Sequence, residues 1–117
     1  MRKKLTILLV VTLFITMMFS TGCKKKFDIQ GTWNLSFIWS NGTHGILALT
    51  FTGGKESGSF SHKNITLGTY TVNDKSVTWK YSLVNTVYTG ASTGDNNMSG
   101  TMVSFNGGTG TWTAVRK

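Results

Sequence analysis

The stretch "GTWNLSFIW", residues 31–39, alternates large apolar residues with small polar ones, and this alternation decides the fold. Positions 33, 35, 37 and 39 carry Trp, Leu, Phe and Trp, whereas positions 32, 34 and 36 carry Thr, Asn and Ser; only Ile38 breaks the pattern. Successive side chains of a β-strand point to opposite faces. The stretch therefore predicts a strand with one buried apolar face and one hydroxyl-rich face.

The same alternation recurs along the chain. It appears in "GILALTF" at 45–51 and in "TGTWTAVR" at 109–116, and "SVTWKYSL" at 76–83 assigns Val77, Trp79, Tyr81 and Leu83 to one face. No segment after residue 27 repeats its apolar residues with the 3.6-residue period of a helix. The sequence therefore predicts an all-β domain without a substantial helix.

Turn signals rich in Gly, Asn and Asp separate these strands at regular intervals. They lie near residues 41, 53, 63, 74, 84, 95 and 107, and such residues tolerate the positive φ angles of tight hairpins. Turns spaced this evenly indicate an antiparallel meander of eight strands. We expect the strands to close into an up-and-down barrel, which leaves no exposed edge. A two-sheet β-sandwich would show the same pattern and is the alternative.

The N-terminus has the plan of a secretory signal peptide: basic residues at 2–4, an apolar run at 5–19 and small residues at 20–22. The run is shorter than the roughly 20 residues that a membrane-spanning helix needs. The small residues before Cys23 resemble a bacterial lipobox, which implies acylation of Cys23 and cleavage before it. We therefore predict a lipoprotein signal peptide at 1–22, a lipid-anchored basic tether at 23–28 and a β-barrel domain at 29–117. Secretion with a free cysteine and an uncut anchor are the alternatives.

The charge balance indicates a membrane-anchored domain and no nucleic-acid partner. After cleavage the chain keeps nine Lys or Arg residues against four carboxylates, a net charge of +5, but three of the lysines form the tether at 24–26. Lysines at a membrane surface contribute about 1 kcal/mol each against anionic lipid. The expected location is the bacterial cell envelope, with the outer membrane favoured in a Gram-negative cell because Lys24, and no aspartate, follows Cys23.

Nothing in the sequence indicates catalysis, a cofactor or a metal. The four carboxylates are isolated from one another, and neither G-x-S-x-G nor H-E-x-x-H occurs. A hairpin folded at Gly53 and Gly54 would bring His44 and His62 opposite each other. Two imidazoles without a third ligand bind zinc poorly, so we expect no metal site.

Gly31, Trp33 and Arg116 resemble the signature of the calycins, the group that includes lipocalins, fatty-acid-binding proteins and avidins. The resemblance spans residues 31–116. It implies an eight-stranded barrel in which Trp33 plugs one end and Arg116 packs across it. The chain is shorter than a typical lipocalin and lacks the long first loop and the flanking helix. It is most similar to the class of short lipocalin-like bacterial lipoproteins.

This resemblance implies that the rim opposite the plugged end carries function, because loops at a barrel mouth commonly bind ligands. The turns near 41, 63, 84 and 107 would form that rim. We predict that a small hydrophobic molecule binds there. The alternative is an envelope interaction or inhibitor module with a filled barrel and a protein partner that the sequence does not identify. The candidate ligand-binding residues are Trp39, Trp79, Tyr81, Tyr88 and Phe105.

Overall fold

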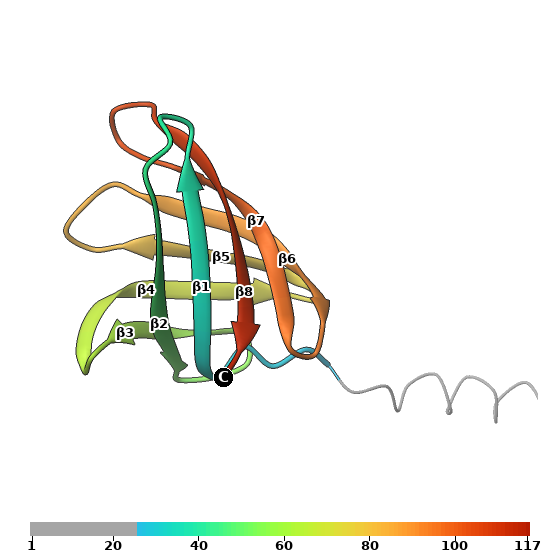
Figure 1. Cartoon of the computed structure of the whole chain (residues 1–117). Coiled ribbons are helices and arrows are strands. Elements are labelled where there is room, and N and C mark those ends of the chain that lie inside the picture. The colour runs from blue at the N-terminus through green and yellow to red at the C-terminus, as the bar shows by residue number, and fades with distance from the viewer. Residues whose placement is uncertain (1–25) are drawn as a thin grey trace, which may run out of the picture.

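The computed structural model describes residues 26–117, which form a closed barrel of eight antiparallel strands (Figure 1). The predicted signal peptide and Cys23 lie outside the described residues. No helix in the described part is long and apolar enough to cross a membrane. In chain order the strands are β1 (Gly31–Trp39), β2 (His44–Thr52), β3 (Ser57–His62), β4 (Ile65–Asn73), β5 (Ser76–Tyr81), β6 (Val87–Gly94), β7 (Asn97–Val103) and β8 (Thr109–Arg116).

The barrel closes because β1 pairs with both its neighbour in sequence and the last strand. Leu35 lies opposite Leu47 of β2 on one side and opposite Ala114 of β8 on the other. Every other strand pairs with the strands before and after it. The predicted up-and-down barrel is therefore confirmed, and the sandwich is excluded because its two sheets would leave β1 and β8 unpaired with each other.

All seven predicted turns connect strands where the sequence placed them. The turn between β3 and β4 lies in "SHKN" at 61–64, which contains no Gly or Asp, yet Lys63 and Asn64 both adopt positive φ angles, 51° and 66°. Two consecutive residues with positive φ form the type I′ turn that matches the twist of paired strands. The hairpin geometry therefore depends on backbone conformations that Asn tolerates and Lys adopts at some cost.

Two expectations about side-chain placement were wrong. Leu83 is 97% exposed, because β5 ends at Tyr81 and the alternation of faces stops where strand pairing stops. His44 and His62 do not lie opposite each other. The loop between β2 and β3 includes residues 53–56, so Thr50 pairs with Ser61 and the register shifts away from the expected one. His62 contacts the carbonyl oxygen of Ala48 instead, through Nδ1 at 2.7 Å.

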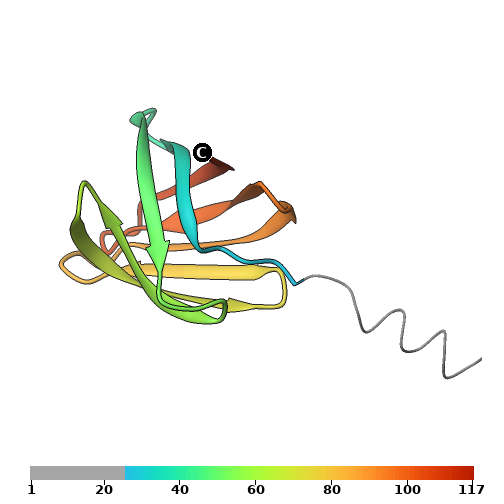
Figure 2. The same ribbon diagram turned by 90° about the horizontal axis from the view of Figure 1, so that it is seen from below.

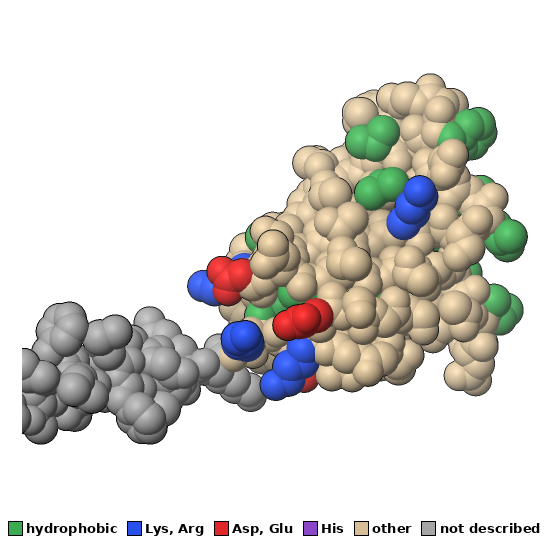
Figure 3. Space-filling model, turned by 180° about the vertical axis from the view of Figure 1, so that it is seen from behind, with side chains coloured by type: hydrophobic (Ala, Val, Ile, Leu, Met, Phe, Trp, Pro, Cys, Tyr) green, Lys and Arg blue, Asp and Glu red, His purple; other side chains and the backbone are tan. Residues whose placement is uncertain are grey.

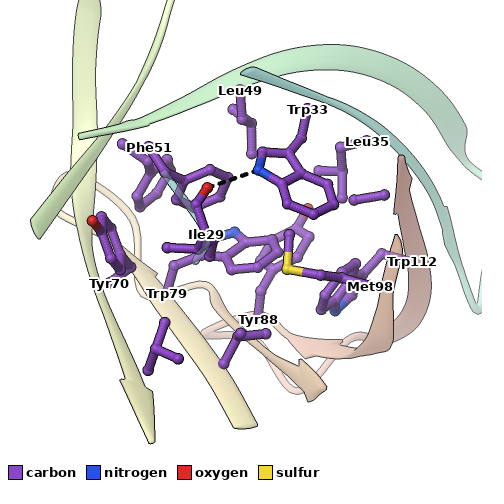
Figure 4. Packing of buried hydrophobic residues seen from close by; sticks show 14 of the residues in the cluster. Ile29, Trp33, Leu35, Leu49, Phe51, Tyr70, Trp79, Tyr88, Met98 and Trp112 are labelled. Atoms are coloured by element: carbon purple, nitrogen blue, oxygen red, sulfur yellow. Dashed lines mark hydrogen bonds between the residues drawn. The ribbon is translucent and has the colours of Figure 1, made fainter. Parts of the chain in front are cut away.

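The inward faces of the strands form one core that fills the barrel (Figure 4). Glycine is required where rings press against the wall. A Cβ at Gly90 would lie 2.7 Å from Cζ2 of Trp112 and 2.1 Å from the carbonyl oxygen of Ser99, so no larger residue fits there without movement. The largest fully buried side chains are Trp33, Trp79, Trp112, Tyr70, Phe51, Phe60, Ile29, Leu35, Leu49, Met98, Met102 and Val77.

Candidate binding site at the open end of the barrel

The two ends of the barrel differ, and the loops define them. The closed end carries the turns at 53–56, 74–75 and 95–96 together with the segment that enters the barrel at residue 26. The open end carries four rim loops, at 40–43, 63–64, 82–86 and 104–108. Figures 1 and 2 show the chain entering at the side away from these rim loops.

Arg116 and Trp33 seal the closed end with the geometry that the calycin resemblance implies. The guanidinium carbon of Arg116 lies 4.4 Å from the centroid of the Trp33 ring, a cation–π contact. The same guanidinium donates to the carbonyl oxygens of Gln30 at 2.7 Å and Asp28 at 2.6 Å. Trp33 is fully buried, and its Nε1 donates to the carbonyl oxygen of Ile29 at 2.8 Å. Both residues therefore have a structural role here.

The segment before β1 completes this seal, although its range was predicted to be a tether. Ile29 is fully buried, and Phe27 packs edge to face against Trp33 with ring centroids 6.0 Å apart. The chain therefore packs against the barrel from Phe27 onward, within the range assigned to the tether. The signal was present, because apolar residues at 27, 29 and 33 keep the alternation of β1 upstream of Gly31.

Trp79 lies at the centre of an aromatic stack that fills the middle of the barrel. Its ring stacks on Tyr88 with centroids 5.2 Å apart and an interplanar angle of 16°, and it lies 4.6 Å from the ring of Trp112. Trp79 and Tyr88 are 1% and 4% exposed. These two candidate residues therefore lie in the core, beneath the open end, and a ligand cannot touch their faces without displacing neighbours.

Above this stack the core ends in a layer of partly buried hydrophobic residues, which we call the mouth cluster. All of its members pack against the core and keep some exposed surface. A cavity of about 290 Å³ adjoins Trp39 and extends between two rim loops, bordered by Asn41 and Ser104. None of its lining residues is charged. The members of the mouth cluster are Phe37, Trp39, Leu47, Leu67 and Tyr81.

Two tyrosine hydroxyls supply polar groups at this end, one from Tyr81 in the mouth cluster and one from Tyr88 in the core beneath it. Burial raises the pKa of the Tyr88 hydroxyl, and the neighbouring Tyr81 raises it further. Burial also raises the pKa of Tyr81, although a hydrogen bond with Tyr88 offsets part of that effect. Both hydroxyls therefore stay protonated at neutral pH. Deeper in the core, Nε1 of Trp79 has no hydrogen-bond partner, which is costly for a buried donor.

The two ends of the barrel also differ in the side chains on their outer surface (Figure 3). Charged side chains gather at the closed end near the entering chain, and exposed hydrophobic side chains gather toward the opposite end. Phe105, the remaining candidate, lies on the rim loop 104–108 and is 74% exposed. It does not border the cavity at Trp39. The structure thus brings Trp39 and Tyr81 into the mouth cluster and leaves Phe105 outside it.

Within residues 26–117 no group of three or more His, Cys, Asp or Glu side chains could hold a metal ion. No protein-family model and no curated protein matches the chain. A solved structure of a redesigned β-barrel is similar with a TM-score of 0.59 and 15% identity, over 76% of this chain and 91% of its own. Another redesigned β-barrel, mFAP1, was solved bound to DFHBI. It is similar with a TM-score of 0.60 and 19% identity, over 75% of this chain and 94% of its own. These similarities show the barrel fold.

Proposed function

We propose that this protein is a lipocalin-like lipoprotein of the bacterial cell envelope that binds a small hydrophobic molecule at the mouth of its barrel. The observation that carries the proposal is the mouth cluster, whose aromatic and aliphatic side chains keep exposed surface and whose Trp39 borders an uncharged cavity. Ligand sites are typically concave and mostly apolar with a few polar groups. The similarity to mFAP1 adds support, because that barrel holds a bound molecule.

The filled core limits how the ligand would lie. Trp79, Trp112 and Tyr88 occupy the middle of the barrel, so the molecule rests across the mouth in contact with Trp39 and Tyr81. The Tyr81 hydroxyl donates a hydrogen bond to an acceptor on the ligand. The ligand is therefore a flat or short hydrophobe, neutral or weakly polar, and not a long chain that needs a deep cup.

A fluorescence titration tests the binding. The lipid-free protein with Cys23→Ser is titrated with fatty acids, retinoids, tetrapyrroles and biotin while its tryptophan emission and melting temperature are recorded. A ligand at the mouth quenches the emission and raises the melting temperature, and Trp39→Phe removes most of the quenching. Trp33→Phe is the matched control, because Trp33 lies at the closed end and its replacement should leave the quenching in place.

The second candidate function is an interaction or inhibitor module that uses only the outer surface. The aromatic stack of Trp79, Tyr88 and Trp112 favours it, because a filled barrel needs no ligand to be stable. If no compound changes the emission or the melting temperature, the small-molecule proposal is wrong and this candidate replaces it.

The anchor is tested separately. Cys23→Ser should move the protein from the membrane fraction to the soluble fraction without unfolding it, because the described core begins at Phe27. Mass spectrometry of the native protein should find an N-terminal, acylated Cys23. An intact N-terminal Met1 or a free thiol at Cys23 would refute the lipoprotein assignment.

A further inference from the structure

Most of the large hydrophobic side chains that are exposed in the described barrel lie in the rim loops or near the same ends of the strands. Leu83 is 97% exposed, Phe105 74% and Ile65 66%, and each comes from a different rim loop or from the first residue after one. Val84 lies in the rim loop 82–86, and Ile38, Ile46 and Val103 lie near the same ends of their strands; all four are also exposed. Among the large hydrophobic residues exposed in residues 26–117, Val115 alone lies at the closed end. Exposed hydrophobic residues are therefore concentrated at the open end of the described barrel.

The charges near this surface have one sign. All four carboxylates of the chain, Asp28, Glu56, Asp74 and Asp95, lie in the closed-end turns or the entering segment. The open end carries Lys63 in a rim loop and Lys80 next to the last residue of β5. In Figure 3 one blue side chain stands among the green ones away from the entering chain. The open end is therefore apolar, cationic and free of carboxylates.

We propose that the rim loops dock on an anionic lipid bilayer. Single apolar side chains on separate loop tips can each enter the boundary between headgroups and acyl chains, while neighbouring lysines stay at the headgroups. Each lysine near an anionic surface changes the partitioning by about fivefold. Burying Leu83 and Phe105 contributes more, about tenfold or greater for each side chain.

This surface is distinct from the small-molecule site and does not depend on it. Leu83 and Phe105 are outside the mouth cluster, and neither borders the cavity at Trp39. Because the chain enters the barrel at the closed end, the rim loops point away from residue 26. A molecule held by its N-terminus therefore presents the rim loops to a second bilayer surface.

A vesicle-bridging experiment tests the proposal with the full chain. The protein is inserted into neutral phosphatidylcholine vesicles and the loaded vesicles are isolated by flotation. Protein-free acceptor vesicles, with or without about one third phosphatidylglycerol, are then added, and bridging is measured by energy transfer between labelled lipids. We expect bridging to the anionic acceptors, and a loss of tenfold or more with the double variant Leu83→Asp and Phe105→Asp.

Matched variants separate the contribution of the exposed hydrophobic side chains from that of the lysines. Val115→Asp places one such charge on an exposed hydrophobic residue at the closed end and should leave bridging unchanged. Lys63→Gln with Lys80→Gln should reduce the preference for anionic acceptors and its sensitivity to salt. The proposal fails if the rim variant bridges as well as the wild type, or if Val115→Asp reduces bridging as much as the rim variant does. It also fails if bridging appears only when both vesicle populations carry the protein, because the rim would then bind a second copy.

Discussion

The closed end and the open end of this barrel are built from the same alternating strands. The side chains at the closed end are covered and hydrogen-bonded, whereas those at the open end stay partly exposed. At the closed end, Arg116 covers Trp33 and its donors reach the carbonyl oxygens of Asp28, Gln30 and Asp95. At the open end, Trp39 and Tyr81 keep exposed surface. The contrast indicates that stability is concentrated at the closed end, and that the open end is free to contact other molecules.

Replacing a tryptophan at each end tests this division most directly. Trp33→Ala should cost roughly 3–5 kcal/mol of unfolding free energy, the usual range for truncating a buried aromatic side chain. It also leaves the carbonyl oxygen of Ile29 without its donor. Trp39→Ala should cost less, because Trp39 is only partly buried. Denaturant midpoints of the two variants decide the matter, and a larger loss for Trp39 would place the stability centre at the mouth.

The next largest effect should come from Arg116. Arg116→Met keeps an apolar stem over Trp33 but removes the guanidinium that donates to Gln30 and Asp28. We expect a loss of about 1.5–3 kcal/mol, the range for hydrogen bonds made by charged groups. Lys117→Met is the control, because Lys117 is exposed and its replacement removes the same charge one position later. Equal losses in thermal or urea unfolding would mean that net charge, and not the clamp, is responsible.

How far the sequence predicts the molecule can be judged at both ends. The strand number, the turns and the closed end with Trp33 and Arg116 follow from alternation, turn residues and the calycin resemblance, because each depends on local pattern. The exposure of Leu83 and the strand register at His62 do not follow from local pattern. They depend on where pairing stops and on how many residues a loop takes up, which only the closed barrel determines.

The candidate site shows the same limit. Alternation correctly places Trp79 and Tyr88 on the inner face. However, it does not tell a residue that lines a cavity from one that fills it, because that depends on how rings from several strands stack. The stack of Trp79 on Tyr88 brings together β5 and β6, and its contact with Trp112 adds β8. Of the five candidate residues, Trp39 and Tyr81 lie in the mouth cluster, and Phe105 lies outside it on the rim.

Alkaline pH should destabilise the barrel through Tyr88, which lies in the core beneath the open end. Because the pKa of Tyr88 is raised in the folded barrel, its stabilising contribution is complete below pH 10, the ordinary tyrosine pKa, and is lost as the pH rises above it. While the unfolded chain is ionised and the folded one is not, each pH unit costs about 1.4 kcal/mol. Melting temperatures at pH 9 and pH 11 should therefore fall less in Tyr88→Phe than in the wild type. An identical fall in both proteins would show that Tyr88 does not carry this sensitivity.

Acid should act on the closed end, with the smallest effect of the four. Burial alone would raise the pKa of Asp28, but hydrogen bonds from Gln30 and the charges of Lys55 and Arg116 together lower it below 3.8. Because the folded-state pKa is lowered, the stabilisation is complete above the unfolded-state pKa and is lost as the pH falls through the folded-state pKa. Asp28→Asn keeps an oxygen to accept from the Gln30 backbone nitrogen, which lies 3.0 Å away, but cannot titrate. Its melting temperature should therefore drop less than that of the wild type between pH 6 and pH 3.

Because part of the effect is Coulombic, 0.5 M salt should narrow the difference without abolishing it. A difference that vanishes in salt would assign the whole effect to Lys55 and Arg116, and one that salt does not change would assign it to the Gln30 hydrogen bonds.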